Sequence, residues 1–124
     1  MSNSLRRFDT KDMAWQTHPT VHSILLKTFE NKASGVGYDA VLVQLKAGDR
    51  IDWHWHPEST ETVYIIQGTG KIYGVEQEAQ QAGAEGLNLT PGVAVTIPIA
   101  LRHAVDNTGS SDMLILAIHS PATI

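Results

Sequence analysis

Two histidines separated by one residue, with a glutamate five positions later, constrain this chain more than any other feature. His54 and His56 lie within residues 48–68. Successive side chains of a β-strand point to opposite faces, so a strand would direct both imidazoles the same way, with their Cα atoms roughly 7 Å apart. Pro57 begins a short turn-forming stretch, and Glu61 opens a β-branched and aromatic run. The pattern predicts a hairpin whose returning strand brings Glu61 level with the two histidines.

Two neutral imidazoles and one carboxylate are nitrogen and oxygen ligands suited to a divalent metal ion. The chain has no cysteine, which excludes thiolate ligands, disulfides and a cysteine nucleophile. A His-x-His pair on a strand is also common on a solvated surface, so the pair alone is weak evidence. A second block, residues 92–107, strengthens it by supplying another histidine, His103.

Together the two blocks resemble the paired motifs of the cupin superfamily. The first family motif has Gly, five residues, His-x-His, three or four residues, Glu, six residues and Gly, and it is matched by Gly48, His54, His56, Glu61 and Gly68. The second has Gly, five residues, Pro-x-Gly, two residues, His, three residues and Asn, and it is matched by Gly92, Pro98, His103 and Asn107. Ala100 stands where the family has its second glycine, which we expect to disfavour a positive φ at this turn.

The resemblance implies a metal ion held by four side chains: His54, His56, Glu61 and His103. It also implies an all-β fold, the single-domain jelly-roll barrel of cupins, also called a double-stranded β-helix. Four protein ligands would leave one or two open positions on a five- or six-coordinate ion, whereas Zn is more often tetrahedral and closed. We therefore expect a divalent metal cofactor, with Fe, Mn or Ni favoured over Zn.

Short strands separated by turns are predicted along the rest of the chain, which favours a β-sandwich or barrel over a fold with crossover helices. A length of 124 residues with 42% apolar residues suits one domain with one core. We predict a polar lead-in over residues 1–20 and a barrel domain over residues 21–124. Besides the two strands of the first motif, strands are expected over residues 21–29, 38–45, 71–75, 93–97 and 113–118. Residues 76–86 lack apolar anchors and are expected to form an exposed excursion, with room for a helical turn.

Several polar side chains are candidates for roles around the metal. Asp52 shares strand parity with His54 and His56, and the full set of pocket or acid–base candidates is Gln44, Asp52, Tyr73 and His119. Each could equally be structural. His18 precedes a proline and is expected to be solvated rather than a ligand. Asn107 is expected to fix the backbone of the barrel.

Strand alternation also predicts an apolar outer surface. Trp53 and Trp55 would face outward from the metal strand, and Tyr64 and Ile66 from the returning strand. A monomer rarely leaves such a patch in water. Two covers are considered: residues 1–20 folded over it as an intrachain lid, or a second copy of the chain. Proteins of the resembled family often pair, which favours a homodimer.

Charge and hydropathy exclude some partners. A formal net charge of −4 without a basic cluster argues against nucleic acid. The first residues lack the apolar core of a secretory signal, and no stretch has the length of a membrane span, so we expect a cytoplasmic protein without a membrane partner.

Three function classes remain open. The first is a metal-dependent enzyme acting on a small oxygenated molecule, of dioxygenase, isomerase or decarboxylase type. The second is a non-catalytic module that binds or senses a small ligand. The third is a barrel that keeps its metal for stability only, which the intact ligand set argues against. No appended helical or DNA-binding domain is evident, and a sensor would need one to report its signal, so the enzyme is favoured.

Overall fold

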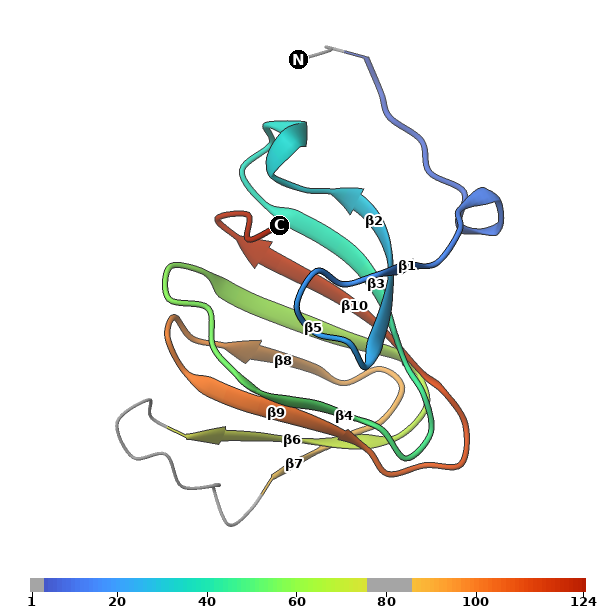
Figure 1. The fold of residues 1–124 in the computed structure, drawn as a ribbon, viewed down its shortest axis with the longest axis vertical. Coiled ribbons are helices and arrows are strands. Elements are labelled where there is room, and N and C mark those ends of the chain that lie inside the picture. Colours follow the sequence, from blue (N-terminus) through green and yellow to red (C-terminus); the bar gives the residue numbers. More distant parts are fainter. Residues whose placement is uncertain (1–3, 76–85) are drawn as a thin grey trace.

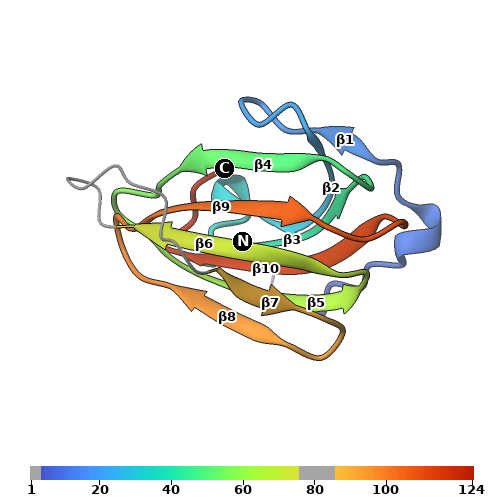
Figure 2. The same ribbon diagram turned by 90° about the horizontal axis from the view of Figure 1, so that it is seen from below.

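The computed structural model describes residues 4–75 and 86–124, which form two antiparallel β-sheets around one interior (Figure 1). The six-stranded sheet has the order β1 (Gln16–Thr17), β2 (Ile24–Glu30), β3 (Asp39–Leu45), β10 (Met113–Ser120), β5 (Thr60–Gln67) and β8 (Ala94–Ile97). The four-stranded sheet has the order β4 (Arg50–His54), β9 (Arg102–Asn107), β6 (Gly70–Val75) and β7 (Leu87–Leu89). Figure 2 shows these four strands one below the other in this order. The predicted all-β cupin-type barrel is confirmed.

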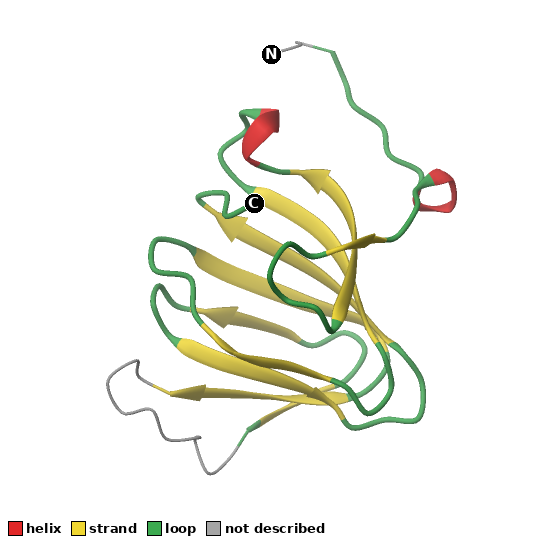
Figure 3. Cartoon of the chain, in the orientation of Figure 1, coloured by secondary structure: helices red, strands yellow, loops and turns green. Residues whose placement is uncertain are grey.

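Helical structure in the described residues is limited to two 3-10 turns, η1 (Thr10–Asp12) and η2 (Lys32–Ser34), drawn red in Figure 3. Neither is long and apolar enough to span a membrane. The expected strands are present within a few residues of their predicted bounds. Three strands, β1, β7 and β9, were not predicted. β1 and β7 have two and three residues, which carry too little alternation to be recognised. In β9 three consecutive residues from His103 to Val105 are buried, so alternation does not mark it. The predicted excursion, with its helical turn, lies outside the described residues apart from Gly86.

The core fills the space between the two sheets. In β10 every second residue is buried, from Met113 through Ile115 and Ala117 to His119. Leu45 of β3 and Ile65 of β5 are fully buried beside them. Burying a side chain of this size contributes about 1.5–3 kcal/mol, so alternation along the strands is what holds the two sheets together. The same alternation places a histidine, His119, at the end of an apolar row.

The predicted hairpin between the two strands of the first motif is wrong. β4 pairs with β9 in the four-stranded sheet, whereas β5 pairs with β10 and β8 in the other sheet. The intervening residues therefore cross from one sheet to the other. Glu61 still comes level with the histidines, but it does so across the interior.

This crossing also contradicts the predicted outer patch. Trp53 lies in β4 of the four-stranded sheet, and Trp55 follows β4 and lines the interior cavity. Tyr64 and Ile66 lie on the six-stranded sheet. Because the outer faces of the two sheets point in opposite directions, these four side chains do not form one surface. The homodimer stays a prediction that no longer has this support.

The N-terminal segment packs on β2 at the edge of the six-stranded sheet (Figure 1). Arg6 forms an ion pair with Glu30 at 2.7 Å, and the rings of Phe8 and Phe29 lie 5.5 Å apart. The ammonium group of Lys27 donates a hydrogen bond to the Thr10 carbonyl at 2.7 Å. The described lead-in is thus anchored along β2 rather than folded over Trp53 as a lid.

Candidate metal centre

A β-bulge in β4 sets the position of the first histidine. Ile51 stands opposite Val105, but His54 stands opposite His103, so β4 has one residue more than β9 over this stretch. The extra residue breaks the alternation. Ile51 and His54 both face the interior, whereas Asp52 is exposed and its carboxylate accepts a hydrogen bond from the Trp53 amide at 2.8 Å. The predicted inward orientation of Asp52 is therefore wrong.

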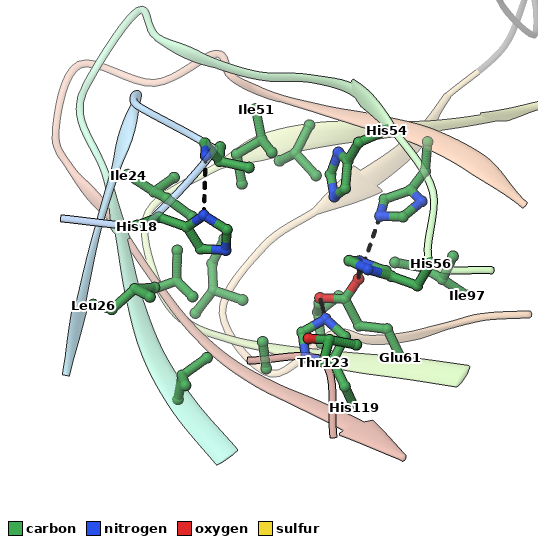
Figure 4. A pocket seen from close by; sticks show the side chains of 18 of the residues that line it. His18, Ile24, Leu26, Ile51, His54, His56, Glu61, Ile97, His119 and Thr123 are labelled. Carbon is green, nitrogen blue, oxygen red and sulfur yellow. Dashed lines mark hydrogen bonds and ion pairs between the residues drawn. The ribbon is translucent and has the colours of Figure 1, made fainter. Parts of the chain in front are cut away.

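Four side chains from separate parts of the chain converge on one point. His54 ends β4, His56 follows it in the connection, Glu61 lies in β5 and His103 lies in β9. One nitrogen or oxygen atom from each lies within 4.8 Å of the others. Figure 4 shows His54, His56 and Glu61 directed toward a common region of the interior. The structure brings together the four residues that the sequence motif singled out.

Backbone carbonyls orient two of the imidazoles. The Nδ1 atom of His54 lies 2.7 Å from the Asp52 carbonyl oxygen, and that of His103 lies 2.9 Å from the Leu101 carbonyl oxygen. A carbonyl only accepts, so each Nδ1 carries the proton and donates it. Each ring therefore presents the lone pair of its Nε2 atom, and in both cases the carbonyl belongs to the residue two positions earlier.

Unpaired polar atoms mark the same place. Among the described residues, the Nε2 atoms of His56 and His103 and the Oε1 atom of Glu61 are buried without a hydrogen-bond partner. The glutamate oxygen lies 3.4 Å from one nitrogen and 3.3 Å from the other. An unsatisfied buried polar atom costs about 1–3 kcal/mol, so three of them facing one another fit a cation bound between them. The cluster is able to bind a divalent metal.

The protonation states suit the same purpose. Burial lowers the pKa of His54 to about 4, and the neighbouring His103 adds to the effect. Burial alone would raise the pKa of Glu61, but the facing imidazoles of His103, His119 and His56 outweigh it and hold the pKa below its usual range. The site therefore offers a neutral imidazole and an ionised carboxylate near neutral pH, which are the states that bind metal.

His119 holds the second oxygen of the glutamate. Its Nε2 atom lies 3.0 Å from Glu61 Oε2, and its Nδ1 atom lies 3.5 Å from Asp39 Oδ2. Asp39 is fully buried and accepts hydrogen bonds from the Thr123 amide at 2.8 Å and hydroxyl at 2.6 Å. This network leaves Glu61 Oε1 facing the histidines. Among the sequence candidates for roles around the metal, His119 is the one that lies beside the cluster.

The other two candidates are on the outer sides of the sheets. Gln44 donates a hydrogen bond to Asp112 at 3.0 Å, and the ring of Tyr73 packs against Trp53 with centroids 6.5 Å apart. Neither lines the interior cavity. Alternation in β3 buries Val43 and Leu45 and so turns Gln44 outward.

Asn107 takes the structural role expected of it. Its side-chain amide donates to the carbonyls of Leu45 at 2.9 Å and Ser111 at 3.0 Å, and its oxygen accepts from the Gly109 amide at 3.0 Å. These bonds tie the end of β9 to β3 and to the turn before β10.

The turn before β9 differs from expectation. Ala100 has a φ of 65°, the one positive φ outside glycine in the described residues. Its amide donates to the His56 carbonyl at 3.0 Å, which ties this turn to the connection that carries His56. The prediction that alanine would avoid a positive φ is therefore wrong, and tertiary hydrogen bonding outweighs the local preference.

The cluster lies in a cavity of about 470 Å³ between the sheets. Apart from the metal cluster and His119, the interior walls are apolar and include Leu26, Val43, Ile51, Val63, Ile65 and Ile115. Residues 18–21 of the N-terminal segment, Trp55, Thr123 and Ile124 also line the cavity. His18 was predicted to be solvated, but its half-buried ring is part of this wall. No motif marked it, because its place depends on how the N-terminal segment packs.

Comparisons with known proteins agree with the fold. A family model described as "Cupin domain" matches residues 41–119. The oxalate decarboxylase OxdC of Bacillus subtilis (strain 168) is 29% identical over 79 residues, which is 64% of this chain and 20% of that protein. The chain spans 20% and 47% of the lengths of two curated relatives that it matches.

Two solved structures show the same architecture. A predicted oxalate decarboxylase from Thermotoga maritima has a TM-score of 0.77 at 15% identity, covering 94% of this chain and 99% of that one. Bacillus subtilis oxalate decarboxylase, studied for its Mn(II) centres, has a TM-score of 0.72 at 22% identity, covering 88% of this chain and 29% of that one. At these identities the likeness concerns the fold.

Proposed function

Because this chain belongs to the cupin family, we propose that it is a divalent-metal-dependent enzyme acting on a small molecule that chelates the ion through oxygen atoms. The observation that carries the proposal is the group of three unpaired buried atoms, on His56, Glu61 and His103, in a cavity whose other walls are largely apolar. A barrel that only needed stability would fill its interior, because cavities cost free energy.

His54, His56, Glu61 and His103 would hold the metal. A divalent ion bound there supplies a Lewis acid that polarises oxygen atoms of the substrate. The remaining work falls to the chain itself. His119 and Asp39 fix the orientation of Glu61, and the apolar walls keep bulk water away from the bound head group. Four protein ligands favour an ion with further open positions, such as Fe, Mn or Ni, over Zn.

The cavity walls suggest the class of substrate. Among the described residues that line the cavity there is no lysine or arginine. A second anionic group away from the metal would therefore be buried without a counter-charge, which is strongly unfavourable. Oxalate, the substrate that the name of the curated relative implies for that relative, could place both carboxylates on the ion, but it would leave most of about 470 Å³ unfilled. We propose a chelating head and an apolar body without a further negative charge, as in a 2-oxo acid, a β-diketone or an enol.

His119 lies between two carboxylates, with Glu61 3.0 Å from its Nε2 atom and Asp39 3.5 Å from its Nδ1 atom. The Nε2 atom supports the glutamate, whereas the Nδ1 atom is buried without a hydrogen-bond partner in the described residues. Isomerisation and decarboxylation both require a proton to be delivered to the substrate, so the contacts of His119 do not separate these two reactions from oxidation by dioxygen.

The alternative is a module that binds the same small molecules without converting them. The test begins with protein purified without added ions, whose metal content is measured. The Fe(II)-, Mn(II)-, Ni(II)- and Zn(II)-loaded forms are then screened for dioxygen uptake and carbon dioxide release with 2-oxo acids, β-diketones, diols and thiols.

We expect turnover in at least one loaded form and none in His103→Ala. Equal metal content in wild type and His103→Ala would contradict the assigned ligands. Tight metal-dependent binding of these compounds without conversion of any of them would favour the binding module.

A further inference from the structure

His18 lies in the cavity wall with one ring nitrogen fixed by the backbone. Its Nδ1 atom accepts a hydrogen bond from the Thr20 amide at 3.0 Å and another from the Val21 amide at 2.9 Å. Figure 4 shows the ring across the cavity from His54 and His56, with the dashed contact to the backbone running upward from the ring in this view. The loop of residues 18–21 thus holds the imidazole by one edge and turns the other edge toward the interior.

These contacts determine where the ring proton is. Two backbone N–H groups directed at one nitrogen require a lone pair there, so Nδ1 is unprotonated. A neutral ring then carries its proton on Nε2. Burial lowers the pKa of His18, and positive charge on His119 or His56 would lower it further, so the ring is neutral near neutral pH. In the described part of the chain no acceptor is paired with this Nε2–H group.

Other polar groups of the wall lie beside charged partners. The Thr123 hydroxyl donates to Asp39 at 2.6 Å, and His119 lies between the carboxylates of Glu61 and Asp39. Trp55 is 40% exposed and lies near the guanidinium of Arg102, 5.5 Å from its ring centroid. The Nε2–H group of His18 is thus a hydrogen-bond donor with a fixed direction, across the cavity from His54 and His56.

We propose that His18 positions the substrate by donating a hydrogen bond from Nε2 to an oxygen or nitrogen acceptor on the substrate's body, away from the chelating head. The substrate class narrows accordingly to molecules with a chelating pair of oxygens, an apolar segment and a neutral hydrogen-bond acceptor. This inference rests on the proposed function, because it takes the head of the substrate to be bound at the metal cluster.

Substitution by asparagine separates the role of Nδ1, which accepts the backbone amides, from the proposed role of Nε2, which donates to the substrate. In His18→Asn the side-chain oxygen takes the place of Nδ1 and can accept the same backbone amides, as asparagine commonly does in turns. Nothing then reaches the position of Nε2. The matched control is His22→Asn, which alters an exposed histidine of the following turn that does not line the cavity.

The probes are hydroxamic acids, which chelate divalent metals through two oxygens. Hexanohydroxamic acid is compared with isosteric acids in which one chain CH₂ group is replaced by an ether oxygen, scanned along the chain. Affinities for the Mn(II)- or Ni(II)-loaded protein are measured by calorimetry, with the metal-free protein as the reference. The ratio of the affinity of each ether acid to that of hexanohydroxamic acid measures the contribution of the ether oxygen as an acceptor, since the head group and the size of the probe are unchanged.

We expect one ether isomer to lose about fivefold or more in affinity relative to hexanohydroxamic acid when His18 becomes asparagine, the loss of one ordinary hydrogen bond. Hexanohydroxamic acid itself should bind wild type, His18→Asn and His22→Asn alike. The ¹⁵N shifts of the His18 ring in the metal-free protein should show the Nε2-protonated tautomer, a readout that needs neither ligand nor activity.

Two results would overturn the role of His18 alone: an ether-to-alkyl ratio unchanged by His18→Asn at every ether position, or a ring protonated at Nδ1. If no hydroxamate binds the loaded protein more tightly than the metal-free protein, the proposed function fails and this inference fails with it.

Discussion

Two parts of the cavity wall are built in different ways. At the metal site the ligands come from strands of both sheets and from the connection between them, and Glu61 and His103 are 7% and 2% exposed. Another part of the wall comes from a loop, residues 18–21, and from the last residues of the chain. Strands hold side chains more rigidly than loops do. We infer that the strands determine how the chelating head of the substrate is bound, and that the loops determine which substrate bodies fit the cavity.

The two parts of the wall are also connected. Asp39 accepts hydrogen bonds from the Thr123 amide and hydroxyl and faces His119, which in turn contacts Glu61 at the metal site. A disturbance at the last residues of the chain can therefore reach the metal site through two buried side chains. The following variants compare the metal site with the rest of the molecule, in order of decreasing expected effect.

Glu61→Gln should abolish tight metal binding, because it removes the negative charge that faces the histidines. Wild type should gain about 4 kcal/mol in unfolding free energy when free metal reaches about 1,000 times its Kd, and the variant should gain little. Thermal unfolding with and without Mn(II), with metal analysis, measures both. The control is Glu58→Gln in the exposed connection. Loss of metal in the control but not in Glu61→Gln would show that the glutamate ligand has been misassigned.

His119→Gln should weaken metal binding about 10- to 100-fold, the usual effect of removing a group that orients a ligand. The reason is that Glu61 Oε2 loses its partner at 3.0 Å. Competition with a chelator of known affinity provides the measurement. Asp52→Asn is the matched control, since its exposed carboxylate contacts only the neighbouring amide in the described structure. An equal loss in both variants would contradict the positions assigned to these residues.

Ala100→Gly should stabilise the protein by about 0.5–1 kcal/mol, because glycine adopts a positive φ without the steric cost that alanine bears. The residue has a φ of 65° and its amide supports the connection that carries His56. Urea unfolding gives the difference. The control is Ala94→Gly in β8, where regular strand geometry predicts a loss of about 0.5–1 kcal/mol. Stabilisation in both variants would point to an effect other than the turn.

Arg6→Ala should have the smallest effect and should leave metal affinity unchanged, since it touches only the lead-in. Hydrogen bonding from Arg6 holds the pKa of Glu30 below its usual value of 4.5. A depressed pKa contributes stability that is present above the usual value and is lost as the pH falls through the lower folded value.

The stability difference between wild type and Arg6→Ala should therefore be full at pH 7 and shrink below about pH 4.5. Unfolding at both pH values measures this, and Arg7→Ala, which alters an exposed neighbour, serves as the control. A difference that grows in acid would contradict the ion pair.

The sequence by itself identified the metal cluster and the class of fold. His54, His56, Glu61 and His103 follow the motif spacing of the resembled family, and that resemblance also implied the barrel of two antiparallel sheets. The local pattern of short strands and turns favoured a β-sandwich or barrel. The buried residues that the strands hold at the metal site were therefore also the most predictable from the sequence. His119 was among several polar candidates, but local pattern gave no means to separate it from Gln44, Tyr73 and Asp52.

Only the tertiary structure decided how these parts meet. The bulge that turns Asp52 outward requires the pairing of β4 with β9, and the crossing between sheets separates Trp53 from Tyr64. The positive φ of Ala100 depends on a hydrogen bond to the distant His56 carbonyl, and the place of His18 depends on the packing of the N-terminal segment on β2. Each of these features is set by contacts between residues far apart in the chain. Such contacts produce no periodic pattern in the local sequence, so the sequence alone could not predict them.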